Sequence, residues 1–264
     1  MRKFSGSSRS SRRIRLGQHM LVAERTADQI VDSSELLPED VVLEIGTGTG
    51  TLTKRLAQRV KRVISYEVDP RLFEEACLDL LKFRNVELVY GDAFKKENDS
   101  AFNVCVTNLP YSQSLTFVKW LSRRPSRFRL AVATLQSEFA QKLLSAPGEN
   151  SYKAVSVMAQ LSFDLNRLFS IGPEAFHPKP KVNSEIVKFY PKTDIPWPFM
   201  DQRKITLLNF LFSFRGRFLN SAVKKLAERT SPITLSNAIL SKRVEELSPA
   251  EFVLILHKIE GSRT

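Results

Sequence analysis

The residues best suited to chemistry are Asn108 and Tyr111, which stand in the segment Asn108-Leu109-Pro110-Tyr111. The apolar run 104–106 precedes them and predicts a short buried strand, so they would lie at a strand end, where open α/β sheets bind ligands. The amide oxygen of Asn108 can accept a hydrogen bond from an amino group, and the ring of Tyr111 offers a face to a stacked base. Pro110 would stiffen the turn. The same residues also suit an ordinary strand-end turn, so the sequence upstream decides between the two.

Three strand ends upstream carry residues that suit an adenosine-containing ligand. The turn Gly46-Thr47-Gly48-Thr49-Gly50 is rich in glycine, which lets backbone and helix N-terminus approach a ligand closely. Glu67 ends the next strand, where an acid can bind both ribose hydroxyls. Asp92 follows the third strand and can accept a hydrogen bond from an adenine amino group. The strands expected here are 41–45, 62–68 and 86–90. As an ordered set, these residues favour an adenosine-containing cofactor over structural turns.

The spacing of the glycines distinguishes two classes of cofactor. It is G-x-G-x-G from Gly46 to Gly50, whereas a dinucleotide site has G-x-G-x-x-G. An NAD-dependent oxidoreductase would also leave the segment 108–111 without a role. The sequence therefore argues against a nicotinamide cofactor.

These residues resemble the motifs of the rRNA adenine N6,N6-dimethyltransferase family. The glycine-rich turn, Glu67, Asp92 and the segment 108–111 are similar to the motifs of S-adenosylmethionine-dependent enzymes that methylate adenine N6. Leu16-Gly17-Gln18-His19-Met20-Leu21 is similar to the N-terminal motif of the family, although Asn and Phe are frequent where His19 and Met20 stand. The segment from Phe176 to Ser184 matches the signature F-x-P-x-P-x-V-x-S. The small-subunit branch of the family is the most similar.

The resemblance implies a fold, a reaction and a set of site residues. The implied fold class is α/β, a Rossmann-like class I S-adenosylmethionine-dependent methyltransferase domain with a small C-terminal helical domain. The implied reaction is dimethylation of adenine N6 in small-subunit ribosomal RNA, linked to ribosome biogenesis, with S-adenosyl-L-methionine as cofactor and no metal. Tyr111 and Phe176 would sandwich the base. The implied catalytic residues are Asn108, Leu109, Pro110, Tyr111 and Phe176. The implied cofactor-binding residues are Gln18, His19, Leu21, Gly46, Gly48, Gly50, Glu67, Asp92, Ala93 and Asn108.

Other functions remain open at this point. The chain could be a large-subunit rRNA adenine N6-methyltransferase, a DNA adenine enzyme, or a ribosome assembly factor that acts mainly by binding RNA. Intact Asn108 and Tyr111 argue against a protein that has lost its activity.

The charge of the chain points to a partner with phosphates. The formal net charge is +12 over 264 residues. Residues 1–15 hold six basic residues and no acid, with Ser and Gly between them, and so carry half of that charge. We expect 1–15 to be a disordered basic arm that neutralises nucleic-acid phosphates, a solubilising tail being the alternative. The expected partners are small-subunit ribosomal RNA and the small ribosomal subunit or its precursor.

Composition argues against several other classes of protein. No apolar run approaches the roughly 18 residues that cross a bilayer, and the N-terminus lacks the apolar core of a secretory signal. Cys77 and Cys105 stand in separate elements and are typical of a reduced, cytosolic protein. The three histidines are scattered, which disfavours a metal site. We expect a cytoplasmic monomer that does not bind membranes.

The periodicity of the chain predicts three segments. They are the arm 1–15, a methyltransferase domain at 16–194 and a C-terminal helical RNA-binding domain at 195–264. Helices are expected at 26–36, 52–60, 71–82, 115–121, 137–144, 155–161, 205–214, 222–226 and 248–259. Further strands are expected at 130–135, 165–171 and 186–190, the last two as an antiparallel pair joined by the Pro-rich loop 173–182. Two groups of basic residues could contact RNA or form solvated surfaces: Arg123, Arg124, Arg127 and Arg129, and Arg215, Arg217, Lys224 and Lys225.

Overall fold

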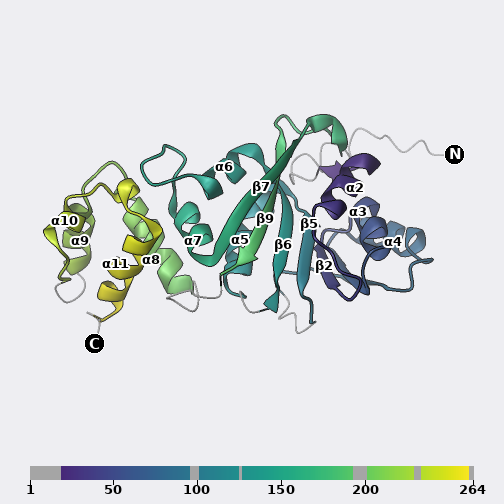
Figure 1. Cartoon of the computed structure of the whole chain (residues 1–264), viewed down its shortest axis with the longest axis horizontal. Helices are drawn as coiled ribbons and strands as arrows, with labels where there is room; N and C mark the ends of the chain where they lie inside the picture. Colours follow the sequence, from purple (N-terminus) through teal and green to yellow (C-terminus); the bar gives the residue numbers. More distant parts are fainter. Residues whose placement is uncertain (1–18, 96–100, 125–126, 193–200, 229–232, 262–264) are drawn as a thin grey trace. The chain divides into compact units, whose positions relative to one another are not determined.

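A seven-stranded sheet organises the chain, as the computed structural model shows (Figure 1). The structure describes residues 19–95, 101–124, 127–192, 201–228 and 233–261. The predicted basic arm 1–15 and the predicted cofactor residue Gln18 lie outside these ranges. The order of the strands is β4-β3-β2-β5-β6-β9-β7. Their bounds are Val41–Ile45 (β2), Arg62–Glu67 (β3), Val86–Tyr90 (β4), Val104–Asn108 (β5), Leu130–Gln136 (β6), Phe163–Ile171 (β7) and Ser184–Pro191 (β9).

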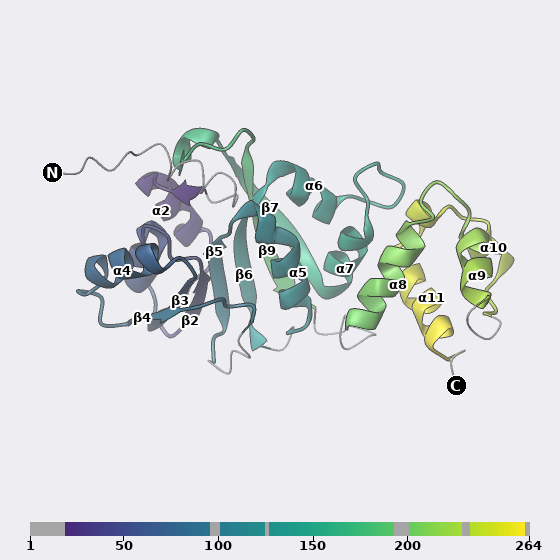
Figure 2. The same cartoon turned by 180° about the vertical axis from the view of Figure 1, so that it is seen from behind.

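The first five strands of this sheet are parallel, and β9 runs antiparallel to β6. The chain passes from β2 to β3 to β4 in one direction across the sheet, and from β5 to β6 in the other. Because such crossovers are right-handed, the helices of the first set cover one face and the helix of the second covers the opposite face. These helices are Thr51–Ala57 (α3) and Pro70–Asp79 (α4) in the first set, and Ser114–Ser122 (α5) in the second (Figure 1 and Figure 2). The predicted α/β class is confirmed.

The central strands are buried on both faces, which explains their continuous apolar sequence. Val104 and Val106 in β5, and Leu130 and Val132 in β6, belong to one hydrophobic cluster and are fully buried. The helix Glu24–Asp32 (α2) adds Ala27, Ile30 and Val31 to this cluster. The periodicity predicted this helix at 26–36, but it ends earlier because the Ser34 hydroxyl donates to the Ile30 carbonyl oxygen and Glu35 takes a left-handed φ of 49°.

A two-stranded sheet, which the sequence did not predict, joins distant parts of the chain. Met20–Leu21 (β1) pairs antiparallel with Phe176–His177 (β8), so that Leu21 lies opposite Phe176. The backbone N–H of Val22 also donates to the Ala175 carbonyl oxygen at 2.9 Å. The first described residues are thereby fixed to the Pro-rich segment that precedes β9.

The amino edge of the large sheet carries a closed network of charges. Asp40, which precedes β2, accepts hydrogen bonds from Leu37 N at 2.7 Å, Asn103 Nδ2 at 2.7 Å and Arg129 Nη2 at 2.6 Å. The buried Lys188 Nζ lies 2.6 Å from the carboxylate of Glu35. Arg129 was one of the arginines that could have contacted RNA, but its guanidinium is part of this network.

The structure divides into two compact units. One contains residues 1–120, 126–140 and 166–191, and the other contains 121–125, 141–165 and 192–264. The second unit therefore takes in residues 141–165 as well as the C-terminal segment predicted from residue 195. The remaining α-helices among the described residues are Ser137–Leu144 (α6), Ala154–Ser162 (α7), Gln202–Phe212 (α8), Leu219–Ala227 (α9), Asn237–Leu240 (α10) and Pro249–Gly261 (α11). Within the second unit, α7 is apolar and packs against α8 and α11.

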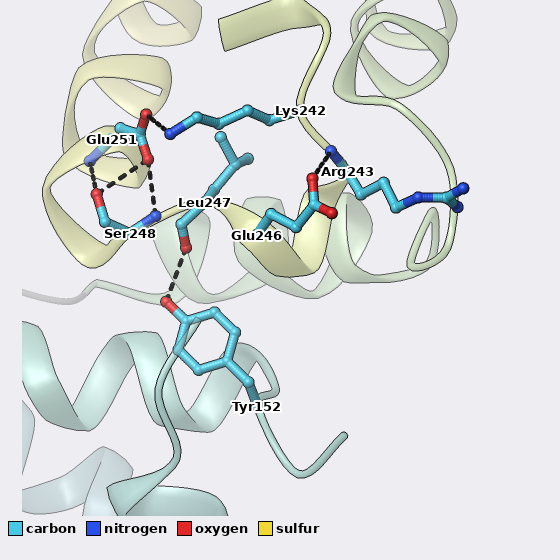
Figure 3. A network of polar contacts seen from close by, with 7 residues as sticks. All are labelled: Tyr152, Lys242, Arg243, Glu246, Leu247, Ser248 and Glu251. Carbon is cyan, nitrogen blue, oxygen red and sulfur yellow. Dashed lines mark hydrogen bonds and ion pairs between the residues drawn. The ribbon is translucent and has the colours of Figure 1, made fainter. Parts of the chain in front are cut away.

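Hydrogen bonds tie the loop before α7 to the start of α11 within the second unit (Figure 3). The Tyr152 hydroxyl, which is buried, donates to the Leu247 carbonyl oxygen at 3.0 Å. Ser248 and Glu251 form a capping box, because each accepts a hydrogen bond from the backbone N–H of the other. Lys242 also binds Glu251 at 2.6 Å. Within the described ranges, none of the helices has the length and hydropathy needed to cross a membrane.

Candidate active site

A cavity of about 260 Å³ opens at the carboxyl edge of the large sheet. It lies at the ends of β2 and β5, where the strand order reverses and where doubly wound sheets bind their ligands. Most of the predicted site residues line it. They are His19, Leu21, Gly46, Gly48, Glu67, Asp92, Ala93, Asn108, Leu109 and Pro110. Gly50, Tyr111 and Phe176 do not.

The glycine-rich turn passes close to the end of β5. Gly46 and Gly48 have φ angles of 90° and 56°, which other L-residues rarely adopt. A Cβ atom on Gly46 would lie 3.8 Å from the Asn108 carbonyl oxygen, so the two strand ends are in near contact. Gly50 is the N-cap residue of α3, and a Cβ atom there would meet the Leu80 side chain instead. Gly50 therefore shapes the turn and does not line the cavity.

Glu67 is held at the end of β3 by backbone N–H groups. Its Oε2 accepts from Gly48 N at 2.9 Å, and its Oε1 accepts from Val68 N and Asp69 N, both at 2.9 Å. The carboxylate therefore fixes the glycine-rich turn to the neighbouring strand. A carboxylate has about four lone-pair positions, so capacity to bind a hydroxyl group remains.

Asp92 is fixed by a short turn of its own. Its Oδ1 accepts from Phe94 N at 2.9 Å, which sets the direction of the carboxylate at the end of β4. Asp69, by contrast, caps α4 through hydrogen bonds from Arg71 N and Leu72 N. Of these two acids, only Asp92 lines the cavity.

The amide of Asn108 has a defined orientation. Its Nδ2 donates to the His19 carbonyl oxygen at 3.1 Å. Because a carbonyl oxygen cannot donate, the amide atom that faces it must be the nitrogen. Asn108 lines the cavity, so Oδ1 is the acceptor that this amide can offer to a ligand there.

The ring of Tyr111 is fixed from two sides. Its hydroxyl lies 2.6 Å from the Ser184 hydroxyl, and its ring centroid lies 5.1 Å from that of His19. The Nδ1 atom of His19 lies 2.6 Å from the Pro178 carbonyl oxygen and must therefore carry the proton. Burial raises the pKa of Tyr111, and the hydrogen bond with Ser184 offsets this only in part.

Phe176 is not at the cavity, which differs from the position expected beside the base. Its side chain is only 2% exposed and packs in the hydrophobic cluster with Leu21 and Ile186. In this conformation Phe176 is a core residue, because its pairing with Leu21 in the two-stranded sheet turns the ring inward. Stacking of the target base on Phe176 stays a sequence-based prediction.

Glu44 also lines the cavity, although its sequence pattern was not recognised as part of the site. Its Oε2 accepts from the hydroxyls of Thr53 and Ser65, each at 2.6 Å. Burial raises the pKa of Glu44 to about 8, and the nearby Glu67 adds to this effect, whereas the two hydroxyls oppose it. An acid within the apolar run Val41–Ile45 was the signal that could have identified it.

The cavity has the opposite charge from the chain as a whole. Glu44, Glu67 and Asp92 line it, and the described lining residues include no Lys or Arg. A chain of net charge +12 thus presents three carboxyl groups in one cavity. Such a cavity suits a ligand that carries both cationic groups and hydroxyl or amino hydrogen-bond donors.

Comparisons with known proteins agree with these features. Residues 9–260 match the family described as ribosomal RNA adenine dimethylase. The chain is 36% identical over 257 residues to the probable ribosomal RNA small subunit methyltransferase A of Methanosarcina barkeri, covering 94% of this chain and 88% of the relative. It is also 36% identical over 245 residues to the protein of the same name from Pyrococcus abyssi, covering 90% and 88%.

Solved structures show the same architecture. The dimethyladenosine transferase from Plasmodium falciparum has a TM-score of 0.77 and 27% identity, covering 92% of this chain and 98% of that one. The 23S rRNA methyltransferase ErmE has a TM-score of 0.68 and 24% identity, covering 91% and 99%. The predicted Rossmann-like class I methyltransferase fold is confirmed.

Proposed function

Because the chain belongs to the ribosomal RNA adenine dimethylase family, we propose that its cavity binds S-adenosylmethionine and that it methylates adenine N6 in small-subunit ribosomal RNA. The activity of the family is the S-adenosylmethionine-dependent dimethylation of adenine, so the product is N6,N6-dimethyladenosine. S-adenosylmethionine supplies the methyl group from a sulfonium centre.

The cofactor residues follow from what each strand end offers. Glu67 accepts hydrogen bonds from the two ribose hydroxyls, since its carboxylate is fixed by backbone N–H groups and lines the cavity. Asp92 accepts from the adenine amino group of the cofactor. The glycine-rich turn admits the cofactor close to the backbone, with Gly46 and Gly48 in contact with the cavity and Gly50 shaping the turn. His19, Leu21 and Ala93 complete the walls, and Gln18 stays a sequence-based prediction.

The observation that carries the proposal is the fixed amide of Asn108. With Nδ2 bound to the His19 carbonyl oxygen, Oδ1 can accept an N–H of the target amine. The backbone carbonyl of Leu109 accepts the second N–H, and Pro110 stiffens the turn that presents both acceptors. These hydrogen bonds favour a pyramidal nitrogen whose lone pair points at the methyl group. Positioning and electrostatics therefore supply the catalysis.

The same acceptors serve both transfers. After the first transfer the amine keeps one N–H, which can still donate to Asn108 or Leu109. Stacking on Tyr111 does not depend on the substituents of N6, so a monomethylated base can stay or rebind. The base has to leave its stack to reach this site.

We also propose which segments contact the RNA, and the oligomeric state and cellular location of the enzyme. The basic arm 1–15 and the C-terminal segment 195–264 contact phosphates, and the exposed Arg217 and Lys224 are the candidate contacts in the described part of that segment. Arg215 has a structural role instead, because it donates to the Tyr152 carbonyl oxygen. The enzyme acts as a monomer in the cytoplasm, where its free cysteines stay reduced. Deleting 1–15 should flatten the salt dependence of RNA affinity.

The experiment that tests the proposal is incubation of the protein with labelled S-adenosylmethionine and separately purified small and large ribosomal subunits. Mass spectrometry of the digested RNA over time should show monomethyladenosine transiently and dimethyladenosine accumulating in the small subunit. Label only in the large subunit would favour the alternative substrate. Binding to small subunits with no methyl transfer would favour an assembly factor. Monomethyladenosine as the sole end point would refute dimethylation.

A further inference from the structure

The signature segment 176–184 ends at a residue that reaches the site. Ser184 is the first residue of β9, and it pairs with Gln136 in the register of β6 and β9. Its side chain is fully buried, and its hydroxyl oxygen lies 2.6 Å from the hydroxyl oxygen of Tyr111. The two residues are 73 positions apart in the chain.

We propose that Ser184 is a positioning residue for the reaction, which holds the ring of Tyr111 in the orientation that receives the target base. This inference rests on the proposed function, in which Tyr111 stacks on the base. The ring of His19 lies against the ring of Tyr111 at a tilt of 37°, and such a tilted contact does not by itself define one orientation of the Tyr111 ring. The hydrogen bond to Ser184 fixes the far end of the ring, because O–H···O bonds of this length are directional.

The hydroxyl of Ser184 is not needed to anchor the strand to which it belongs. The start of β9 is held by Ser137, whose backbone N and Oγ both donate to the Asn183 carbonyl oxygen at 3.0 Å. The next residue, Glu185, accepts from the hydroxyls of Ser137 and Ser170. Ser184 therefore has a dedicated partner in Tyr111, whereas its neighbours have partners that serve the sheet.

The signature segment 176–184 contacts three residues at or near the cavity. Its Pro178 carbonyl oxygen binds the ring of His19, its Phe176 pairs with Leu21, and its Ser184 binds Tyr111. Each end of the segment thus fixes a residue next to the cavity. The segment acts as a template that sets the positions of the residues facing the substrate.

The test is a double-mutant cycle with Ser184→Ala and Tyr111→Phe, measured with small ribosomal subunits that lack the modification. Each single variant should lower kcat/KM for the RNA by roughly 3- to 10-fold, the effect of losing one hydrogen bond, with S-adenosylmethionine affinity unchanged by calorimetry. The double variant should lose no more than either single variant, because both substitutions remove the same bond. Ser137→Ala is the matched control, which removes a hydroxyl of the same neighbourhood that does not contact Tyr111, and it should keep the wild-type kcat/KM.

Three outcomes would overturn the inference. Losses that add in the double variant would mean that Ser184 acts elsewhere. An equal loss in Ser137→Ala would mean that general loosening of β9 is responsible. Wild-type kinetics in Tyr111→Phe would mean that the bond does not matter, a result that holds even if Ser184→Ala does not fold. Failure of the proposed function is distinguishable, because in that case the wild-type protein itself would not methylate the subunit.

Discussion

The two edges of the large sheet both bury a carboxyl group, but they treat it in opposite ways. Asp40 precedes β2 at the amino edge, and Glu44 lies near the end of the same strand. Both are fully buried. Burial alone would raise the pKa of Asp40, but hydrogen bonds led by the one from Arg129 outweigh it and hold that pKa below its usual value. Burial raises the pKa of Glu44 to about 8, because only hydroxyls bind it and Glu67 lies nearby.

The two edges differ in whether the protein itself supplies cations for their acidic residues. At the amino edge, Arg129 and Lys188 supply the positive charge that Asp40 and Glu35 need, so the network is complete within the protein. At the carboxyl edge, the described residues of the cavity supply no Lys or Arg. A cationic ligand would be attracted by the carboxylates of Glu67 and Asp92, whereas Glu44, with its raised pKa, stays protonated near neutral pH. S-adenosylmethionine, with its sulfonium and ammonium groups, has the required charge.

The largest expected effect comes from two asparagines at opposite ends of β5. Asn108→Ala should lower kcat by roughly 10²-fold or more with little change in stability, since we propose that its amide acts in the transition state. Asn103→Ala should instead lower the free energy of unfolding and leave kcat little changed. The reason is that Asn103 accepts a hydrogen bond from Val41 N and donates one to the Asp40 carboxylate at the amino edge. Steady-state kinetics and urea unfolding of both variants test this, and equal losses of activity per folded molecule would remove the distinction between the edges.

The next effect concerns the paired acid. Arg129→Met should lower the free energy of unfolding by about 3 kcal/mol, because it leaves the buried Asp40 without a cation. The matched control is Arg59→Met, which breaks an exposed pair with Asp32 and should cost less than about 1 kcal/mol. Urea unfolding at neutral pH compares them. Similar losses in the two variants would show that the amino-edge network does not depend on burial.

A smaller effect should appear in the pH dependence of stability. Between the usual pKa of 4.5 and the folded value of about 8, folded Glu44 holds a proton that the unfolded chain does not, so stability falls as the pH rises. Glu44→Gln cannot ionise and should reduce this fall by on the order of 2 kcal/mol between about pH 5.5 and pH 8. Asp40 acts at the other end of the scale, because its stabilisation is lost as the pH falls below its usual 3.8. Parallel unfolding curves for Glu44→Gln and wild type would contradict the raised pKa.

The smallest effect is on stability and comes from the loss of one hydrogen bond between uncharged groups, which serves as a reference for the charged network. Tyr152→Phe should cost about 1 kcal/mol, because it leaves the Leu247 carbonyl oxygen without its donor in a buried place (Figure 3). Tyr90→Phe, at a tyrosine that is 53% exposed, should cost at most a few tenths of a kcal/mol. Thermal unfolding measures both. A loss for Tyr152→Phe as large as that for Arg129→Met would imply that charge is not what sets the amino edge apart.

The residues at the carboxyl edge could be predicted from the sequence because their positions follow from the order of the strands and from short-range contacts. Parallel strands place their ends together, so Gly46, Glu67, Asp92 and Asn108 could be brought to one edge from the order of the strands alone. Capping by Asp69, and by Ser248 with Glu251, was predictable for the same reason, since the groups involved are two or three residues apart.

The features that the sequence did not predict depend on contacts between distant residues. The pairing of β1 with β8 joins residues more than 150 positions apart, and it decides that Phe176 faces the core. The network of Asp40, Arg129 and Lys188 likewise depends on which strands become neighbours. Periodicity shows that a residue is apolar or charged, and it cannot show which distant partner will meet it.

The hydrogen bond that fixes Asn108 is donated by its amide to a main-chain carbonyl oxygen, and this affects how the site can change over evolution. Any amino acid at position 19 brings the same carbonyl oxygen, so the orientation of the Asn108 amide can be kept while the side chain at position 19 changes. The ring of His19 makes a separate hydrogen bond, to the Pro178 carbonyl oxygen. Selection can thus adjust how this part of the chain is anchored without touching the chemistry that depends on it.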